Sequence, residues 1–187
     1  MSSRRRSEGS DHESTPPEPK TLTPYQAWTD GSVRPQNPGF GAAAYVLMSE
    51  EDVWLNGWWL GNDITNNKAE LQAILDCVGF SHDNQLYPLT IYSDSEWAVN
   101  CITGKYKARH NLGLIRAIQS QITAMTDVRL EWVRGHATDI FNNLVDKFAN
   151  IVVRIPHHKY HAEFKKADFL NHSQTFLSEY EKLVRHV

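Results

Sequence analysis

The stretch AWTDGS at residues 27–32 leads an apolar run directly into an aspartate, followed by a glycine and a serine. Asp-Gly is common turn chemistry, so Asp30 could end a strand for conformational reasons alone. Asp30 could also be the first ligand of a metal site. The two interpretations differ in one consequence: a metal site needs further carboxylates from distant parts of the sequence to reach the same place.

The residues around Asp30 predict a sheet that begins with three antiparallel strands. The expected strands are 25–30, 42–48 and 53–61, separated by the turn sequences NPGFG and SEED. Strands so closely spaced pair as an antiparallel meander. We expect Asp30 to close the first strand.

After residue 65 the sequence alternates between helical periodicity and further strands. Strands are expected at 88–94 and 128–133, and helices at 66–80, 95–103, 112–125 and 142–154. Gly79 is expected to end the first helix, and Ser95 to cap the second. This order predicts an α/β fold with a mixed five-stranded sheet, antiparallel at first and parallel afterwards, flanked by helices.

The two ends of the chain differ in composition from the middle. Residues 1–24 are rich in serine, proline and charge, which predicts a disordered tail. The middle, 25–154, is expected to be the main domain, and 155–187 a helical extension. The apolar stripe expected along that extension consists of Phe176, Leu177, Tyr180, Leu183, Val184 and Val187.

Charge and composition exclude few classes of function. The net charge is −3, and residues 25–154 hold ten basic and fourteen acidic side chains. If four of those acids bind two divalent cations, this part is about neutral, so a nucleic-acid substrate is not excluded. No run approaches the roughly 18 apolar residues of a membrane span. Cys77 and Cys101 lack C-x-x-C spacing and are expected to be core residues in a reducing compartment.

Four carboxylates are expected to meet at one edge of the sheet. Asp30 and Asp94 follow strands, and ligands of α/β sheets bind outside the carboxyl ends of strands. Glu70 opens the first long helix, and Asp146 lies at the buried margin of the last. Taken singly, each acid has an ordinary structural explanation, such as a turn or a helix-dipole partner. Together their oxygens indicate Mg²⁺ or Mn²⁺, and four carboxylates suit two ions about 3.5–4 Å apart.

The motifs around these acids resemble ribonuclease H of type 1. They are TDGS with NPGFG, TNNKAEL (65–71), YSDSEW (92–97), EWVRGHA (131–137) and N-x-x-x-D-x-x-A (142–149). The resemblance covers residues 25–154 and implies a ribonuclease H-like sheet. It also implies an endonuclease that hydrolyses the RNA strand of RNA·DNA hybrids and leaves 5′-phosphate and 3′-hydroxyl ends.

By this resemblance Asp30, Glu70, Asp94 and Asp146 are the catalytic and metal-binding carboxylates. Asp30 would bridge two Mg²⁺ ions, for which Mn²⁺ can substitute. Asp146 would help to hold the ion that activates water, and Glu70 and Asp94 the ion at the leaving group. His136 matches a histidine that shuttles a proton or assists product release. An ordinary loop histidine is the alternative.

The resemblance also implies contacts with the hybrid. The residues concerned are Asn37, Thr65, Asn66 and Asn67 for the minor groove and 2′-hydroxyls, Trp97 for the DNA strand, and Lys105, Lys107 and Arg109 for phosphates. For Trp97 core packing is an equal alternative, and for the basic segment a solvated loop. The chain departs from the family pattern at Asn143, where a glutamate is frequent, and in its shortened basic protrusion at 104–111.

Two other functions are weaker alternatives. A 3′–5′ exonuclease would carry Asp-x-Glu in the first strand, where this chain has Asp30-Gly31-Ser32. A non-catalytic nucleic-acid-binding domain would not keep four costly carboxylates. The HHKYH run at 157–161 is expected to be a solvated linker and not a metal site.

The expected partner is the hybrid alone, with no membrane and no obligate protein partner, and the chain is expected to be a monomer. The expected location is intracellular: cytoplasmic for a bacterial or phage protein, nuclear or cytoplasmic for a eukaryotic one.

Overall fold

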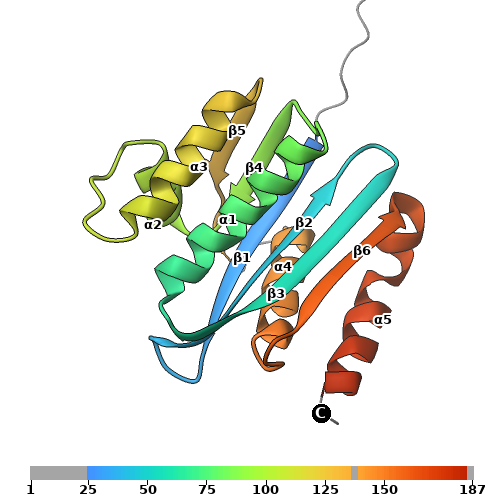
Figure 1. Ribbon diagram of the computed structural model, residues 1–187. Helices are drawn as coiled ribbons and strands as arrows, with labels where there is room; N and C mark the ends of the chain where they lie inside the picture. Colours follow the sequence, from blue (N-terminus) through green and yellow to red (C-terminus); the bar gives the residue numbers. More distant parts are fainter. Residues whose placement is uncertain (1–24, 136–138, 185–187) are drawn as a thin grey trace, which may run out of the picture.

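In a computed structural model, which describes residues 25–135 and 139–184, one mixed sheet carries helices on both faces (Figure 1). Its strands are β1 (Tyr25–Arg34), β2 (Gly39–Met48), β3 (Asp52–Ile64), β4 (Leu89–Ser93), β5 (Val128–Trp132) and β6 (Lys159–Lys165). They lie in the order β5-β4-β1-β2-β3-β6. β1, β2, β3 and β6 pair antiparallel in turn, and β4 and β5 run parallel to β1.

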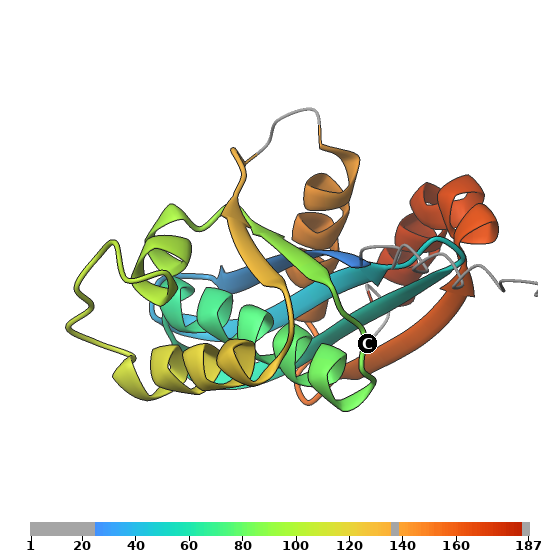
Figure 2. The same ribbon diagram turned by 90° about the horizontal axis from the view of Figure 1, so that it is seen from above.

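The helices divide between the two faces of the sheet. They are α1 (Asn66–Asp83), α2 (Glu96–Ile102), α3 (Leu112–Ala124), α4 (Ile140–Val152) and α5 (Lys166–Val184). Figure 2 shows α1 and α3 on one face and α4 and α5 on the other. Two apolar cores follow from this arrangement, one under α1, α2 and α3 and one under α4 and α5.

β2 contributes to both cores, because successive side chains of a strand point to opposite faces. Tyr45 and Leu47 belong to the core under α1, whereas Ala44 and Val46 belong to the core under α4. All four are almost completely buried. Full burial of a side chain such as Leu47 contributes roughly 1.5–3 kcal/mol, so this central strand anchors both layers.

The sixth strand corrects the prediction of five. Residues 159–165 were expected to lie in a helical extension, but they form β6 and pair with β3 from Asp52↔Lys165 to Trp58↔Lys159. The HHKYH run is therefore no simple linker, since His161 lies in this strand with its Nδ1 2.5 Å from Asn56 Oδ1. Within the predicted extension, Lys166–Val184 forms the helix α5.

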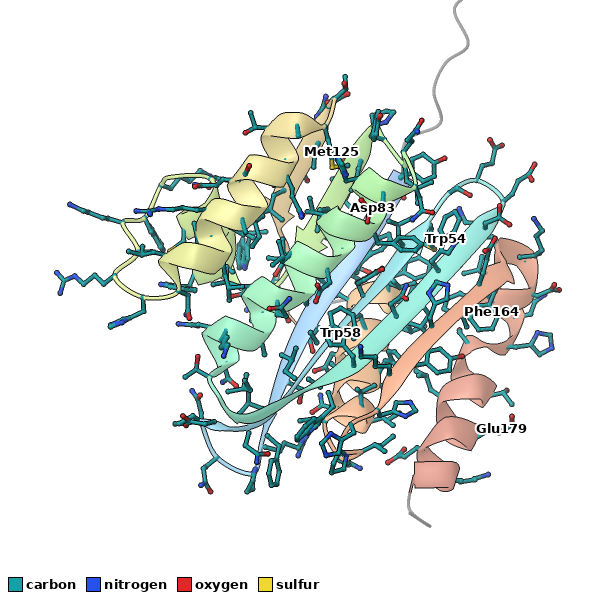
Figure 3. The ribbon with its side chains drawn as sticks, in the orientation of Figure 1. Trp54, Trp58, Asp83, Met125, Phe164 and Glu179 are labelled. Atoms are coloured by element: carbon teal, nitrogen blue, oxygen red, sulfur yellow. The ribbon has the colours of Figure 1, made fainter. Side chains whose placement is uncertain are left out.

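β6 has the alternation of a half-buried strand. Its even-numbered residues, Tyr160, Ala162 and Phe164, are partly buried, and its odd-numbered residues are exposed. Figure 3 labels Phe164 on β6 and Trp54 and Trp58 on β3; Phe164 lies near Trp54, whereas Trp58 lies opposite Lys159 at the other end of β6. The two tryptophans pack against the core under α1, whereas Phe164 packs against the core under α4.

Several predicted boundaries also shift. β1 continues past Asp30, which pairs with Ala44, so Asp30 lies inside the strand and does not close it. Gly79 lies within α1 and does not end it. Ser95 is confirmed as the cap of α2, since its hydroxyl accepts a hydrogen bond from the Ala98 N–H at 3.3 Å. Cys77 and Cys101 are confirmed as buried, unpaired core residues.

Some predictions fall outside the described residues. These are the tail at 1–24, Val187, and the side chains of Phe176, Tyr180, Leu183 and Val184. Of the predicted stripe, Leu177 is described, and it is buried against the α4 side of the sheet. Among the described residues, no helix is both long and apolar enough to cross a membrane.

Candidate active site

The contact between β1 and the start of α1 places Glu70 beside Asp30. The Thr65 hydroxyl caps α1 by accepting a hydrogen bond from the Lys68 N–H at 3.3 Å. Gly31 lets the helix touch the strand, because a Cβ there would lie 2.4 Å from the Glu70 nitrogen and 2.5 Å from the Ala69 carbonyl carbon. Only a residue without a side chain allows this approach.

Asp94 reaches the same place from the neighbouring parallel strand. β4 pairs with β1 up to Thr29↔Ser93, so Asp30 follows in β1 and Asp94 follows directly after the end of β4. The indole N–H of Trp132 donates to the Asp94 carbonyl at 3.1 Å, and the Asn142 amide donates to Asp94 Oδ2 at 3.5 Å. These bonds tie Asp94 to β5 and to α4.

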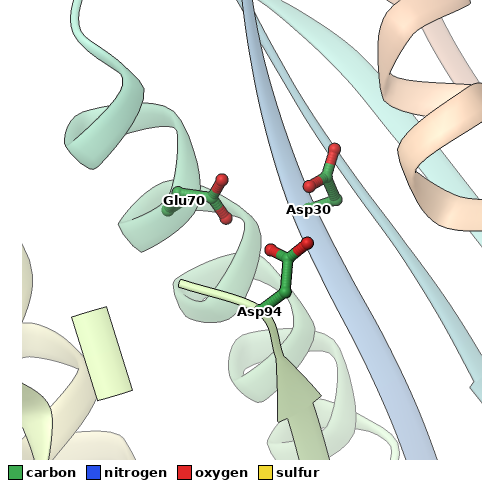
Figure 4. A group of neighbouring side chains, drawn as sticks. All are labelled: Asp30, Glu70 and Asp94. Atoms are coloured by element: carbon green, nitrogen blue, oxygen red, sulfur yellow. The ribbon is translucent and has the colours of Figure 1, made fainter. Parts of the chain in front are cut away.

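Asp30, Glu70 and Asp94 form a compact group of carboxylates, in which one oxygen from each lies within 4.8 Å of the others. Figure 4 shows the three side chains pointing toward one another from β1, α1 and the end of β4. Asp30 is only 6% exposed. Within the described part of the chain, Asp30 Oδ2 and Glu70 Oε2 are buried oxygens without a hydrogen-bond partner.

The surroundings disfavour the charged forms of these acids. Burial, then the charges of Asp94 and Asp146, raises the pKa of Asp30 well above its usual range. Burial, then the charges of Asp30 and Asp94, does the same to the pKa of Glu70. Such a group is costly when ionised without a counter-charge.

Asp146 approaches this group from α4. Asp139 begins that helix: its Oδ1 accepts hydrogen bonds from the N–H groups of Phe141 and Asn142, and its Oδ2 accepts one from the Trp28 indole at 2.8 Å. The helix start is thereby fixed to β1. Asp146 follows two turns later, half-buried, but outside the 4.8 Å group.

A hydrogen-bond network fixes the Asp146 side chain. The Asn150 amide nitrogen donates to Asp146 Oδ1 at 2.9 Å. The Asn150 amide oxygen accepts hydrogen bonds from the Ser32 hydroxyl at 3.0 Å and from Arg34 Nε and Nη2 at 3.1 and 2.7 Å. Because three donors occupy the amide oxygen, the amide nitrogen must face Asp146. Asn150 therefore links β1 to the carboxylate of α4.

The group fits a divalent cation such as Mg²⁺. Its donors are all carboxylate oxygens, which hard cations prefer. Buried oxygens without hydrogen-bond partners need an explanation, and a bound cation supplies one here. Asp30, Glu70 and Asp94 would hold such an ion, with Asp146 next to them.

The residues predicted to contact the minor groove of the hybrid lie near the start of α1. Asn37 Oδ1 accepts a hydrogen bond from the Asn66 N–H at 3.1 Å, which joins the β1–β2 loop to the start of α1. Thr65, Asn66 and Asn67 are exposed and precede Glu70 by three to five residues, and exposed Asn37 joins them through this hydrogen bond. His136 lies outside the described residues.

Trp97 and the basic segment differ in their surroundings. Trp97 is half-buried and packs against the core under α1, α2 and α3, which favours the packing alternative while leaving part of its ring accessible. The predicted phosphate ligands Lys105, Lys107 and Arg109 are exposed in the loop between α2 and α3. Substrate contact by these four residues stays a prediction.

Sequence reasoning missed two asparagines. Asn142 is 2% exposed and donates to Asp94, and Asn150 donates to Asp146. The signal for Asn150 was its position four residues after Asp146, where helical side chains meet. The contact of Asn142 with Asp94 joins residues 48 positions apart and has no local signal.

In this site acidic side chains gather beside a parallel strand pair, and their oxygens suit a divalent cation. Such a site is typical of a class of α/β enzymes that act on phosphate esters. Comparisons with known proteins narrow this class. A family model described as RNase H matches residues 23–154. The ribonuclease H of Anaeromyxobacter dehalogenans is 31% identical over 149 residues, which cover 68% of this chain and 79% of that protein. The ribonuclease H of Caldicellulosiruptor saccharolyticus is 28% identical over 142 residues, covering 68% and 94%.

A solved structure agrees. The ribonuclease H1 of the halophilic archaeon Halobacterium salinarum has a TM-score of 0.58 and 25% identity, over 69% of this chain and 96% of that one. The chain belongs to the ribonuclease H family. The predicted family, the ribonuclease H-like fold and the class of enzyme, a nucleic-acid hydrolase, are therefore confirmed.

Proposed function

We propose that this chain hydrolyses the RNA strand of RNA·DNA hybrids at the carboxylate group, leaving 5′-phosphate and 3′-hydroxyl ends. The observation that carries the proposal is the convergence of oxygens of Asp30, Glu70 and Asp94 within 4.8 Å. Two of these acids have a buried oxygen that no residue described in the structure hydrogen-bonds. In a member of this family, such a group is the place where a phosphodiester and its counter-ions would be held.

The chain's own residues would hold and orient these participants. Asp30, Glu70 and Asp94 would bind one or two Mg²⁺ ions, and Asn150 would keep Asp146 turned toward them. When bound, divalent ions lower the pKa of water and stabilise the charge that develops on phosphorus. Burial of Asp30 excludes bulk water from one side of the site, which strengthens these electrostatic effects.

Selection of a hybrid would rest on the exposed polar residues beside Glu70. Asn37, Thr65, Asn66 and Asn67 offer short amides and hydroxyls, which can read the 2′-hydroxyls of RNA. The DNA strand would pass near Trp97, which is only partly buried, and near the three cations of the basic loop.

The test is a substrate panel with the full chain and Mg²⁺. End-labelled RNA·DNA hybrid, single-stranded RNA, duplex RNA and duplex DNA are incubated side by side, and the products are sized on a denaturing gel. We expect cleavage of the RNA strand in the hybrid alone, with 3′-hydroxyl ends that a polymerase can extend. No cleavage of the hybrid, or equal cleavage of all the RNA substrates, contradicts the proposal.

A further inference from the structure

The C-terminal segment forms one wall of a hollow beside α4, the helix that carries Asp146. Beyond residue 154, where the family match ends, β6 and α5 join the domain, and α5 packs beside α4. Leu177 of α5 and Ile151 of α4 are both buried in the same core. Between these two helices lies a hollow of about 400 Å³, which we call the α4–α5 hollow.

Cations outnumber anions in this hollow. Arg34, Lys147 and Arg154 line it, against the carboxylates of Asp146 and Glu181. The floor is apolar, formed by Ile151 and Leu177. A polar ligand with negative charge would meet Arg and Lys side chains over an apolar floor, where charge interactions are stronger than in open water.

One cation of the hollow is held by a weak ion pair. Arg154 Nη1 lies 3.5 Å from Glu181 Oε1, and both side chains are substantially exposed, at 45% and 37%. Exposed pairs of this kind contribute little to stability. Arg154 can therefore exchange Glu181 for a stronger oxyanion, such as a phosphate that its planar guanidinium contacts with two N–H groups.

The hollow reaches Asp146, the carboxylate that approaches the Asp30, Glu70 and Asp94 group from α4. Asp146 and Asn150 line it, and Asn150 fixes the Asp146 carboxylate. A nucleic-acid strand carries a phosphate at every nucleotide. A strand with one phosphodiester at Asp30, Glu70 and Asp94 would therefore present a further phosphate to cations on the far side of Asp146.

We propose that the α4–α5 hollow binds a backbone phosphate of the strand held at the carboxylate site, at a position flanking the reacting bond. Arg154 and Lys147 are its cationic ligands, and Glu181 is a competing anion that the phosphate displaces. Lys147 and Arg154 lie within the segment that matches the family model, but the α5 wall of the hollow, with Leu177 and Glu181, lies beyond it. The inference rests on the proposed function, because it assumes a bound strand.

The test compares Arg154→Gln with Glu181→Gln in the full chain. Binding of a fluorescent hybrid is measured by anisotropy without divalent cations at several salt concentrations, and cleavage kinetics are measured in Mg²⁺. Arg154→Gln should weaken binding roughly fivefold and reduce the slope of log affinity against log salt by about one. Glu181→Gln should tighten binding. In Mg²⁺ the KM for the hybrid should rise in Arg154→Gln and fall in Glu181→Gln.

A matched pair of controls exists at the opposite edge of the sheet. Arg129 of β5 lies 3.3 Å from Asp127 in an exposed ion pair, so Arg129→Gln and Asp127→Asn make the same charge changes there. They should leave hybrid affinity unchanged. Lys147→Gln gives a second test of the hollow, with weakened binding expected, and thermal unfolding checks that each variant is folded.

Opposite effects of Arg154→Gln and Glu181→Gln support the inference, because loss of a merely structural ion pair would shift both variants the same way. Shifts in the same direction, or shifts no larger than those of the controls, overturn it. A third outcome also overturns it: inorganic phosphate binds in an Arg154-dependent way, but Arg154→Gln leaves hybrid affinity unchanged. The hollow would then bind free phosphate only. If the native chain neither binds nor cleaves the hybrid, the proposed function fails as well.

Discussion

Asp76 on α1 is an acid whose surroundings oppose its charge, away from the carboxylate site. Its carboxylate accepts a hydrogen bond from Gln72 Nε2 at 2.9 Å, but burial raises its pKa from 3.8 to about 6. Between these two pH values the folded state holds the proton more tightly than the unfolded chain does. The free energy of unfolding therefore falls as pH rises from about 4 to about 6.

We expect Asp76→Asn to stabilise the protein at pH 8 by about 2 kcal/mol, because asparagine keeps an acceptor for Gln72 and carries no charge. Near pH 4 the gain should vanish. Chemical denaturation at both pH values measures it, with the exposed Asp83→Asn as a control that should change little. A gain that is equal at both pH values would show that the charge of Asp76 is not its cause.

Asn150 is the residue on which the position of Asp146 depends. Asn150→Ala removes the donor to Asp146 Oδ1 and leaves Arg34 without this acceptor. A hydrogen bond to a charged group is worth about 1.5–3 kcal/mol, so kcat for hybrid cleavage should fall about tenfold or more while KM changes little. Ser178 lines the α4–α5 hollow as Asn150 does, but the structure describes no hydrogen bond from it to Asp146. Ser178→Ala should therefore leave kcat unchanged. An unchanged kcat in Asn150→Ala contradicts the positioning role.

At the scale of elements, the contact between β1 and α1 decides the site. Gly31→Ala would place a methyl group only 2.4 Å from the Glu70 nitrogen, so the helix must move away from the strand. Overpacking of this kind costs typically 1–3 kcal/mol, and a displacement of about 1 Å can lower activity about 100-fold.

The control for Gly31→Ala is Gly113→Ala in α3, where an added Cβ meets no atom within 4 Å. Helix propensity predicts a gain of roughly 0.5–1 kcal/mol there, with unchanged activity. Thermal unfolding and hybrid cleavage of the two variants measure both effects. Equal stability of Gly31→Ala and the native chain would mean that the helix does not press on the strand.

The sequence predicts most elements, because local periodicity defines them. The four helices of 25–154 and five strands were predicted in the right order. All four carboxylates were expected to meet, and three of them, Asp30, Glu70 and Asp94, form the compact group. Asp30 was misplaced at a strand end because Asp-Gly is turn chemistry, whereas pairing of β1 with β2 continues through it. β6 was missed because its alternation of Tyr160, Ala162 and Phe164 is short and lies between polar segments. Its partner β3 is far away in sequence, and only tertiary packing selects it.

At the scale of the whole molecule, the carboxylate group makes metal binding and stability interdependent. A bound Mg²⁺ ion would relieve the repulsion among Asp30, Glu70 and Asp94. Any ligand that binds the folded state alone stabilises it, by about 2.7 kcal/mol at a concentration 100 times its Kd. We expect Mg²⁺ to raise the thermal midpoint of the native chain more than NaCl of equal ionic strength does. Asp30→Asn should raise the midpoint without metal and lose most of the response to Mg²⁺. An equal response to both salts would show that the group binds no cation.

We propose that Asp30 belongs to a metal-dependent site that cuts the RNA strand of a hybrid. The most direct measurement is cleavage of a labelled RNA·DNA hybrid by the native chain and by Asp30→Asn, side by side in Mg²⁺, after circular dichroism has shown both to be folded. We predict that the native chain cuts the RNA strand and that Asp30→Asn is slower by about 1,000-fold, equivalent to about 4 kcal/mol in the barrier. Cleavage by Asp30→Asn at the native rate would contradict the account.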